Sequence, residues 1–299
     1  MRYAVTHRTR YRYDADVTDS LAVAHLTPRS LPWQVVDDAV VAVDPEPADS
    51  SQSLDHYGNV VTYLQVTEPH RELDVVATSV VDVVAPALEA ASLAVPWELL
   101  RPLEDPTLAQ AWRAADLALP SPLVEQPEAA HDYAASSLVA GRPVGEAIAD
   151  LLRRLHADFA YLPGATTVTS TIDDVLERRA GVCQDFAQLF LACVRSHGLA
   201  ARYVSGYLAT EPPPGQERLV GADASHAWVA VWLGGDEWWA VDPTNDQVVD
   251  DRYVTVAWGR DYGDVPPLKG VIFTDATESS LSVEVDVVPT REGGVARAD

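Results

Sequence analysis

Hydrophobic and polar residues alternate at the start of the chain in the way that a half-buried β-strand requires. The apolar positions of this first strand, at residues 2–12 and just beyond, are Tyr3, Val5, Tyr11 and Tyr13. Similar β signals, rich in valine and separated by turn-forming residues, recur at 20–26, 34–43, 59–67 and 73–84. Short strands separated by turns predict an antiparallel sandwich or barrel-like domain over residues 1–85.

The pattern changes at residues 86–127, where prolines interrupt the chain repeatedly. They stand at positions 86, 96, 102, 106, 120, 122 and 127. Only one helical piece, near 107–118, fits between them. We therefore expect a linker that leads from one domain to the next.

From residue 128 the apolar spacing becomes helical. An amphipathic helix entered through Pro143 is marked by apolar residues three and four apart, namely Ile148, Leu151, Leu152, Leu155 and Phe159. Ser170, with Asp173 three residues later, predicts the N-cap of a short helix at 172–179. A second apolar helix is predicted over 182–197, with Gly198 suited to end it.

Strand patterns return after this helix. The expected strands are 200–209, 225–233, 237–242 and 252–258, and a Pro-rich loop at 211–215 separates the first two. A last alternating run at 281–288 is a strand with no partner nearby in sequence, and the pattern does not say which sheet it joins. We expect residues 128–289 to form an α+β domain, with helices packed on an antiparallel sheet, and residues 290–299 to fray.

The charge composition of the chain disfavours some classes of binding partner. The chain has 21 basic and 45 acidic residues, a net charge of −24. Such a surface repels phosphate backbones and anionic lipids, so we expect no nucleic acid and no membrane partner. The first residues hold no apolar stretch typical of a signal peptide, and no run approaches the ~20 apolar residues of a membrane span. We therefore expect a cytoplasmic protein.

The two cysteines, Cys183 and Cys193, have different expected roles. Ten residues on one helix separate them by ~15 Å, whereas a disulfide needs Cα atoms within ~7 Å. Cys193 lies in the apolar stripe and is interpreted as core packing. Cys183 precedes that stripe at the helix N-terminus, where unsatisfied N–H groups and the helix dipole favour a thiolate.

A cysteine nucleophile needs a base and a group that orients the base. His226 begins one predicted strand and Asp242 ends the next, and an antiparallel hairpin of 225–233 with 237–242 would bring the two together. Each residue alone is more often structural: a small core thiol, a satisfied histidine, a turn-forming aspartate before proline. In this order and at these element ends they fit a thiol acyl-transfer triad, but spacing alone leaves both interpretations open.

Longer sequence motifs favour the catalytic interpretation, because they resemble those of a known family. Gly181-Val-Cys-Gln-Asp-Phe186, Gly198-Leu-Ala-Ala-Arg-Tyr-Val-Ser-Gly-Tyr-Leu208, Ala224-Ser-His-Ala-Trp228 and Asp242-Pro-Thr-Asn245 closely resemble the bacterial transglutaminase-like proteins, which share a papain-like core. Leu26-Thr-Pro-Arg29 and Tyr57-Gly-Asn-Val60 resemble the N-terminal β region of that group, and Gly259-Arg-Asp-Tyr262 resembles its C-terminal segment. The resemblance covers nearly the whole chain. It implies Cys183 as nucleophile, His226 as base and acid, and Asp242 as the orienting group.

The expected function is thiol-dependent acyl chemistry on amide bonds, either as an amidase or cysteine peptidase or as a protein-glutamine acyltransferase. The backbone N–H of Cys183 would be one oxyanion donor, with Gln184 or Trp228 as candidates for the second. Tyr207, Trp228, Trp239 and Trp258 are candidates to line an apolar groove. We expect a peptide or protein substrate with an amide or glutamine, an amine as a candidate acceptor, and no cofactor or metal. The alternative is a non-catalytic interaction module on the same scaffold, and nothing indicates the oligomeric state.

Overall fold

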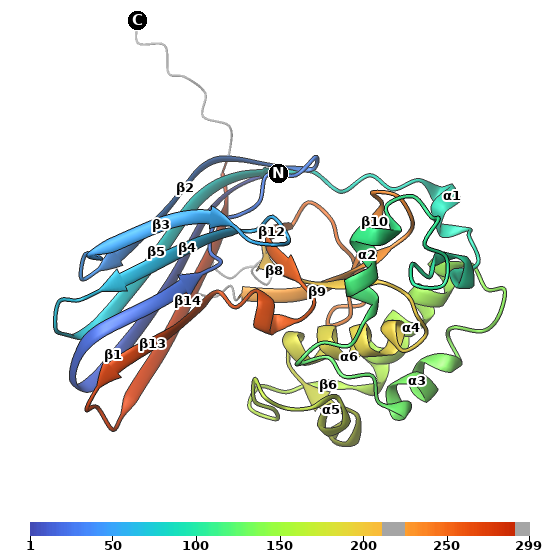
Figure 1. Ribbon diagram of the computed structural model, residues 1–299. Helices are drawn as coiled ribbons and strands as arrows, with labels where there is room; N and C mark the ends of the chain where they lie inside the picture. Colours follow the sequence, from blue (N-terminus) through green and yellow to red (C-terminus); the bar gives the residue numbers. More distant parts are fainter. Residues whose placement is uncertain (211–224, 291–299) are drawn as a thin grey trace, which may run out of the picture.

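The computed structural model describes residues 1–210 and 225–290, which form a long curled β-sheet beside a mixed region of helices and a smaller sheet (Figure 1). The strands are β1 (Arg2–Ala24), β2 (Gln34–Asp44), β3 (Asp49–Leu54), β4 (Val60–Val66), β5 (His70–Val83), β6 (Ala160–Tyr161), β7 (Ala180–Gly181), β8 (Ala201–Leu208), β9 (Ser225–Trp232), β10 (Trp238–Asp242), β11 (Gln247–Val248), β12 (Tyr253–Gly259), β13 (Leu268–Thr274) and β14 (Ser279–Pro289). The α-helices are α1 (Ala90–Leu93), α2 (Ala111–Ala114), α3 (Glu128–Ala135), α4 (Val144–Asp158), α5 (Ile172–Arg178) and α6 (Cys183–Arg195). Short 3₁₀ turns lie at Trp97–Leu100, Ala115–Ala118 and Tyr262–Asp264.

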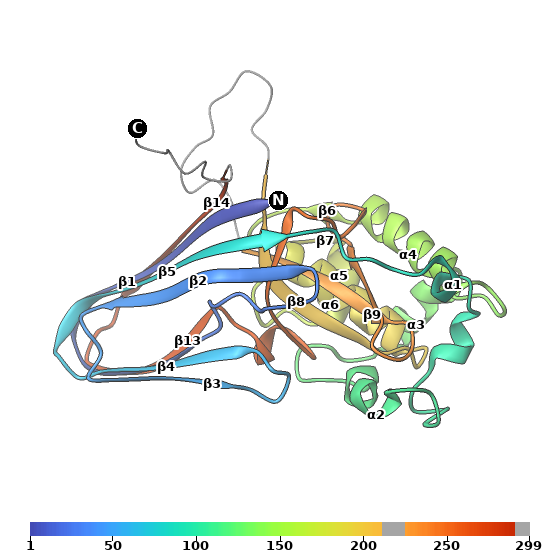
Figure 2. The same cartoon turned by 90° about the horizontal axis from the view of Figure 1, so that it is seen from above.

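The N-terminal sheet is antiparallel, in the order β2-β5-β1-β4-β3, with β13 and β14 also on β1. Strand β1 is long enough to change partners along its length. Its first half pairs with β5 and β14, and its second half pairs with β4 and β13. The register with β5 shifts between Arg12 and Val17, where the strand passes from one set of partners to the other. Figure 2 shows the resulting curl from above. This half-barrel confirms the expected N-terminal β domain.

The last two strands return to the N-terminal sheet. Strand β14 contains the alternating run at 281–288 and pairs antiparallel with β1, from Tyr3 opposite Pro289 to Tyr13 opposite Ser279. Strand β13 pairs with the other half of β1. The division into 1–85, 86–127 and 128–289 stays a prediction, but its last segment supplies two strands to the sheet of the first. The expected loop at 211–215 and most of the expected tail lie outside the described residues.

The second sheet has five strands in the order β11-β10-β9-β8-β12, and helix α6 packs against β8 and β9 (Figure 1). The expected hairpin is present, because β9 and β10 pair antiparallel from Trp238 opposite Trp232 to Val241 opposite Val229. The amphipathic helix is also confirmed as α4, whose apolar stripe is buried. Helices on an antiparallel sheet are the architecture that the sequence led us to expect.

Two local predictions need correction. The helix expected at 107–118 is instead two single turns, α2 and the 3₁₀ turn that follows it. The N-cap of α5 is Thr171 rather than Ser170. Its hydroxyl accepts from the N–H of Asp174 at 3.1 Å, while the Asp174 carboxylate accepts from the N–H of Thr171 at 3.0 Å. This reciprocal capping box satisfies two end groups of the helix, which begins at Ile172 as expected.

One hydrophobic core joins the two sheets. It includes side chains of β1, β5 and β14 together with those of α6, β8 and β9. Gln34 of β2, which is completely buried, adds a polar link to β12. Its amide accepts from the N–H of Thr255 and donates to the C=O of Thr255, both at 2.7 Å. The N-terminal sheet is therefore hydrogen-bonded to the sheet that carries His226 and Asp242.

Replacing Gln34 by alanine should destabilise the protein by about 1–3 kcal/mol, because the N–H of Thr255 would be buried without its partner and the C=O of Thr255 would keep only the bond from the N–H of Arg29. Chemical denaturation of wild type and Gln34→Ala measures this difference. Gln52→Ala is the matched control, since Gln52 is exposed and makes one bond to Thr62. Equal losses of unfolding free energy in the two variants would show that the Gln34–Thr255 hydrogen bonds do not stabilise the protein.

Candidate active site

The sulfur-bearing residue of the site, Cys183, is the first residue of α6. The start of this helix is fixed by Asp185, whose buried carboxylate accepts from the N–H of Val182 at 2.8 Å and from the hydroxyl of Thr166 at 2.6 Å. Gly181 must lack a side chain, because a Cβ there would lie 2.7 Å from Asp185. These contacts place Cys183 at the positive end of a buried helix, where a thiolate is favoured.

The far end of α6 is closed as expected. Gly198 has φ +83°, and its N–H donates to the C=O of Arg195 at 2.8 Å. Left-handed backbone of this kind favours glycine. Cys193 lies in the fully buried part of the helix, and burial raises the pKa of its thiol to about 12. Cys183 is half-buried, and both thiols are free. The two cysteines therefore differ in accessibility as well as position.

His226 and Asp242 meet across the β9–β10 hairpin. The Nε2 atom of His226 lies 2.7 Å from Oδ2 of Asp242. Since Asp242 engages Nε2, the Nδ1 side of the ring is left for Cys183, which lies close enough to raise the pKa of the imidazole. The structure thus brings Cys183, His226 and Asp242 together in the order that an acyl-transfer triad requires.

The carboxylate of Asp242 is completely buried and well satisfied. Its Oδ2 also accepts from Nδ2 of Asn245 at 2.7 Å and from the hydroxyl of Tyr253 at 2.9 Å. Its Oδ1 accepts from the N–H of Thr244 at 2.9 Å. Burial alone would raise the pKa of Asp242, but the hydrogen bond and charge of His226, with Asn245 and Tyr253, hold it below its usual value. Asp242 is therefore an anion that faces the imidazole.

The pKa of the His226 imidazole depends on both Asp242 and Cys183. Burial acts to lower its pKa, but the hydrogen bonds and charges of Asp242 and Cys183 outweigh burial and raise the pKa to about 10. A histidine with this pKa carries a proton at neutral pH. A protonated imidazole between a sulfur and a carboxylate can stabilise a thiolate and later deliver the proton to a leaving group.

Asp242→Asn should lower the pKa of His226 markedly, because the opposing charge disappears while burial remains. In wild type the ring should stay protonated through neutral pH and lose its proton only as the pH rises toward about 10. In the variant the proton should be lost at a clearly lower pH. NMR titration of the imidazole in both proteins measures the difference, and identical titration curves would contradict the coupling.

The pocket candidates have different surroundings. Gln184 is the second residue of α6 and half-buried. Trp228 is buried, with its ring 6.3 Å from that of His226 and 5.3 Å from that of Tyr253. Tyr207 packs between the sheets, where its hydroxyl lies 3.0 Å from Nδ1 of His7, so its position gives no support to a pocket role. Their expected roles stay predictions.

Sequence reasoning did not single out the residues that hold the triad in place. Asn245 lies in the quoted Asp242-Pro-Thr-Asn245 string, so a signal for it existed. Tyr253 belongs to none of the quoted motifs, and its contact with Asp242 depends on how β12 is placed. Asp185 and Thr166 fix the start of α6, and only the Gln-Asp that follows Cys183 in the sequence hinted at the former.

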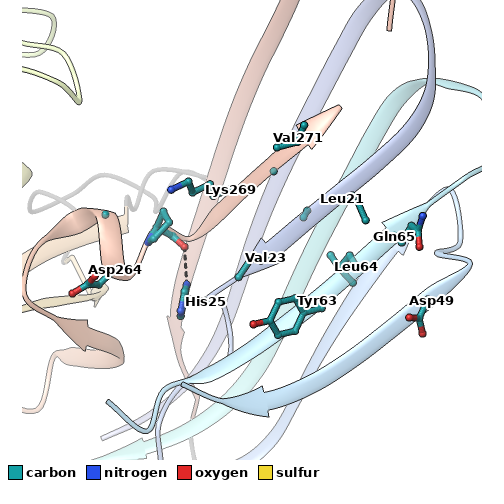
Figure 3. Close-up of a pocket in the computed structure, with 14 residues that line it drawn as sticks. Leu21, Val23, His25, Asp49, Tyr63, Leu64, Gln65, Asp264, Lys269 and Val271 are labelled. Atoms are coloured by element: carbon teal, nitrogen blue, oxygen red, sulfur yellow. Dashed lines mark hydrogen bonds between the residues drawn. The ribbon is translucent and has the colours of Figure 1, made fainter. Parts of the chain in front are cut away.

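Two cavities among the described residues lie apart from this site, since neither is lined by Cys183, His226 or Asp242. The first, of about 550 Å³, lies on β1, β4 and β13, and Figure 3 shows Lys269, Tyr63 and Val271 around it. The second, of about 850 Å³, is rich in tryptophan. Its lining includes Trp258 but not Trp239, which is buried in the main core.

Neither a membrane-spanning helix nor a metal-ligand cluster occurs in the part of the chain that the structure describes. No helix of residues 1–210 and 225–290 is long and apolar enough to cross a membrane. The same residues contain no group of three or more side chains suited to a metal ion. The expectations of a cytoplasmic location and of chemistry without a cofactor stay predictions.

Comparison with known proteins identifies the family to which this chain belongs. Residues 3–82 match the bacterial transglutaminase-like N-terminal region, and residues 132–243 match the transglutaminase-like superfamily. The chain is 48% identical over 295 residues to an uncharacterized protein of Mycobacterium tuberculosis, covering 96% of this chain and 93% of the relative. An uncharacterized protein of Mycobacterium leprae is 36% identical, with 96% and 98% covered. The chain belongs to the transglutaminase-like superfamily, in the group with the bacterial N-terminal region.

Two further proteins are similar, one over part of the sequence and one in fold. A protein-glutamine gamma-glutamyltransferase of Pseudomonas aeruginosa is 34% identical over 131 residues, which is 38% of this chain and 20% of that protein. The crystal structure of a candidate cysteine protease from Cytophaga hutchinsonii superimposes with a TM-score of 0.74, covering 97% of this chain and 92% of that one. At 20% identity the second similarity shows the shared fold.

Proposed function

We propose that this protein performs thiol-dependent acyl chemistry on amide bonds, with Cys183 as nucleophile, His226 as acid and base, and Asp242 as orienting group. The observation that carries the proposal is the 2.7 Å contact of His226 Nε2 with Asp242, which leaves the opposite side of the ring for the sulfur at the start of α6. The superfamily, which includes cysteine proteases and transglutaminase-like enzymes, supports an enzymatic role.

In the acylation step the thiolate of Cys183 attacks the amide carbonyl carbon. The protonated imidazole of His226 then gives its proton to the leaving nitrogen, and a thioester remains. The oxyanion formed on the way needs donors. The N–H of Cys183 is one, because the first N–H groups of a helix have no partner within it. Gln184 and Trp228 are candidates for the second donor.

In the second step the neutral imidazole of His226 takes a proton from an incoming water or amine. That nucleophile attacks the thioester carbon and releases the Cys183 thiolate. Water gives hydrolysis, and an amine gives a new amide bond. We favour a hydrolytic enzyme acting on peptide or protein substrates, including glutamine side chains, because no described residue marks an amine-donor site. We expect neither nucleic acid nor membrane as a partner, since the net charge is −24.

Ammonia release from a library of glutamine-containing peptides tests this function, measured with and without an added amine. We expect wild-type protein to release ammonia from some peptides without amine. Product that forms only with amine would reassign the protein as a transferase. Ammonia at the level of buffer under both conditions, together with no peptide-bond cleavage in the library, would favour the non-catalytic interaction module.

A further inference from the structure

A groove lined by tryptophan lies between the N-terminal sheet and the five-stranded sheet. Its volume is about 850 Å³, and it is bordered by the segment after β1, the β3–β4 loop, α2 and the β9–β10 turn. The tryptophans of this groove are Trp33, Trp112, Trp232, Trp238 and Trp258. We call it the tryptophan groove. The proposed acyl chemistry does not use it.

Arg202 of β8 forms part of the groove wall and is 93% buried, with an exposed fraction of 7%. Its guanidinium carbon lies 3.6 Å from the ring centre of Trp258 and 4.4 Å from that of Trp238. The side chain is therefore held between two aromatic faces, so its hydrogen-bonding edge, rather than its flat face, is what remains for a ligand.

No acceptor satisfies that edge within residues 1–210 and 225–290. The Nε atom is buried without a hydrogen-bond partner, and no carboxylate of the described residues lies within ion-pair distance of the guanidinium. Burial holds the pKa of Arg202 well below its ordinary value, and the nearby charge of Arg29 adds to this effect. A buried cation without an anion is costly, and stacking on two rings offsets only part of that cost.

The other cation of the groove lining, Arg113, and the nearby Arg29, whose Nε is also buried without a partner, each make at least one contact with a neighbouring side chain. Arg113 lies 3.5 Å from Asp236, and Arg29 donates to the side-chain oxygen of Asn59. Arg202 is thus the cation of the groove wall that lacks an acceptor among the described residues. An incoming anion would supply one.

We propose that the tryptophan groove binds a carboxylate carried on an apolar or aromatic body, with the edge of Arg202 as its anchor. A planar carboxylate matches the fork of donors on a guanidinium, and the tryptophan walls suit an apolar body. Asp116 and Asp236 border the same groove and disfavour a multiply charged phosphate group, whereas Arg202 disfavours a cation. A free carboxylic acid and the C-terminus of a peptide share this chemistry.

Calorimetry on the full chain with two pairs of ligands tests the proposal. The first pair is 3-phenylpropionate and its uncharged amide, and the second is acetyl-Ala-Phe with a free carboxylate and the same peptide as a C-terminal amide. We expect the acid of at least one pair to bind about tenfold or more tightly than its amide, as a charge-assisted hydrogen bond implies. Preference in the first pair identifies small acids, and preference in the second identifies peptide ends. Equal binding, or no binding, in both pairs would overturn the proposal.

Variants locate the binding. Arg202→Gln should remove the preference for the acid, whereas Lys269→Gln should keep it. Lys269, the only lysine of the chain, borders the separate cavity of Figure 3 and makes a matched control. Trp112→Ala should weaken acid and amide alike several-fold, and because Trp112 is 74% exposed this variant tests the location even if Arg202→Gln fails to fold. Loss of preference in Lys269→Gln, or unchanged affinities in Trp112→Ala, would place binding elsewhere and contradict the proposal.

Discussion

Replacing Cys183 by alanine should reduce amide turnover by about 10⁴-fold or more, because removing the nucleophile of a catalytic triad leaves only binding and oxyanion stabilisation. Cys183 is half-buried at the start of α6 and packs against the edge of the main core without belonging to its fully buried residues, so the fold should survive the change. Ammonia release or peptide cleavage by the purified variant, compared with wild type, measures the loss. Circular dichroism checks that the variant is folded.

Cys193→Ala is the matched control on the same helix. Its thiol is completely buried and belongs to the core, so the substitution should lower stability while leaving turnover close to that of wild type. Turnover that survives Cys183→Ala, or that is lost equally in both folded variants, would rule out Cys183 as the nucleophile.

Replacing Asp242 by alanine should affect both stability and rate. The carboxylate is completely buried with hydrogen bonds from several neighbours, so its removal leaves a buried imidazolium without its anion and should cost about 3–5 kcal/mol of unfolding free energy. Turnover should fall by about 10³–10⁴-fold, because the imidazole loses the group that fixes its orientation and tautomer. Denaturant titration and steady-state kinetics measure the two effects.

Asp250→Ala provides the comparison for Asp242→Ala. Asp250 pairs with Arg252 near the surface, where both side chains are partly exposed and an ion pair contributes about 0–1 kcal/mol. Asp242→Asn separates rate from stability, because the amide keeps the shape of the carboxylate without its charge. Full turnover in a folded Asp242→Asn variant would mean that the carboxylate has no part in the chemistry.

The local parts of this fold could be predicted from the sequence because their causes are local. The stripe of α4 and the glycine that ends α6 are properties of a few consecutive residues. The β9–β10 hairpin could also be predicted, since two strands joined by a short glycine-containing turn pair with each other. By contrast, β14 pairs with residues 3–13 of β1, and alternation at 281–288 cannot identify a partner so distant in sequence.

The same division applies to the site. The positions of Cys183, His226 and Asp242 at the ends of their elements made their meeting a reasonable hypothesis. The contact of Tyr253 with Asp242 depends on the placement of β12, which no pattern specifies. Tyr207 is a candidate for the pocket on the sequence, and it lies near His226 in the sheet. It instead faces the interface with β1 and hydrogen-bonds to His7. Which face a strand residue uses for packing or for a ligand depends on the neighbouring domain.

Whether the imidazole activates the sulfur is tested most directly by alkylating wild type and His226→Gln with iodoacetamide at pH 6.5. Peptide mapping then measures the rate of modification at Cys183. If the protonated ring of His226 stabilises the thiolate, Cys183 of wild type should react about tenfold or more faster than Cys183 of the variant, while buried Cys193 stays unmodified in both. Equal rates at Cys183 in the two folded proteins would show that sulfur and imidazole act independently, and the proposed triad would be refuted.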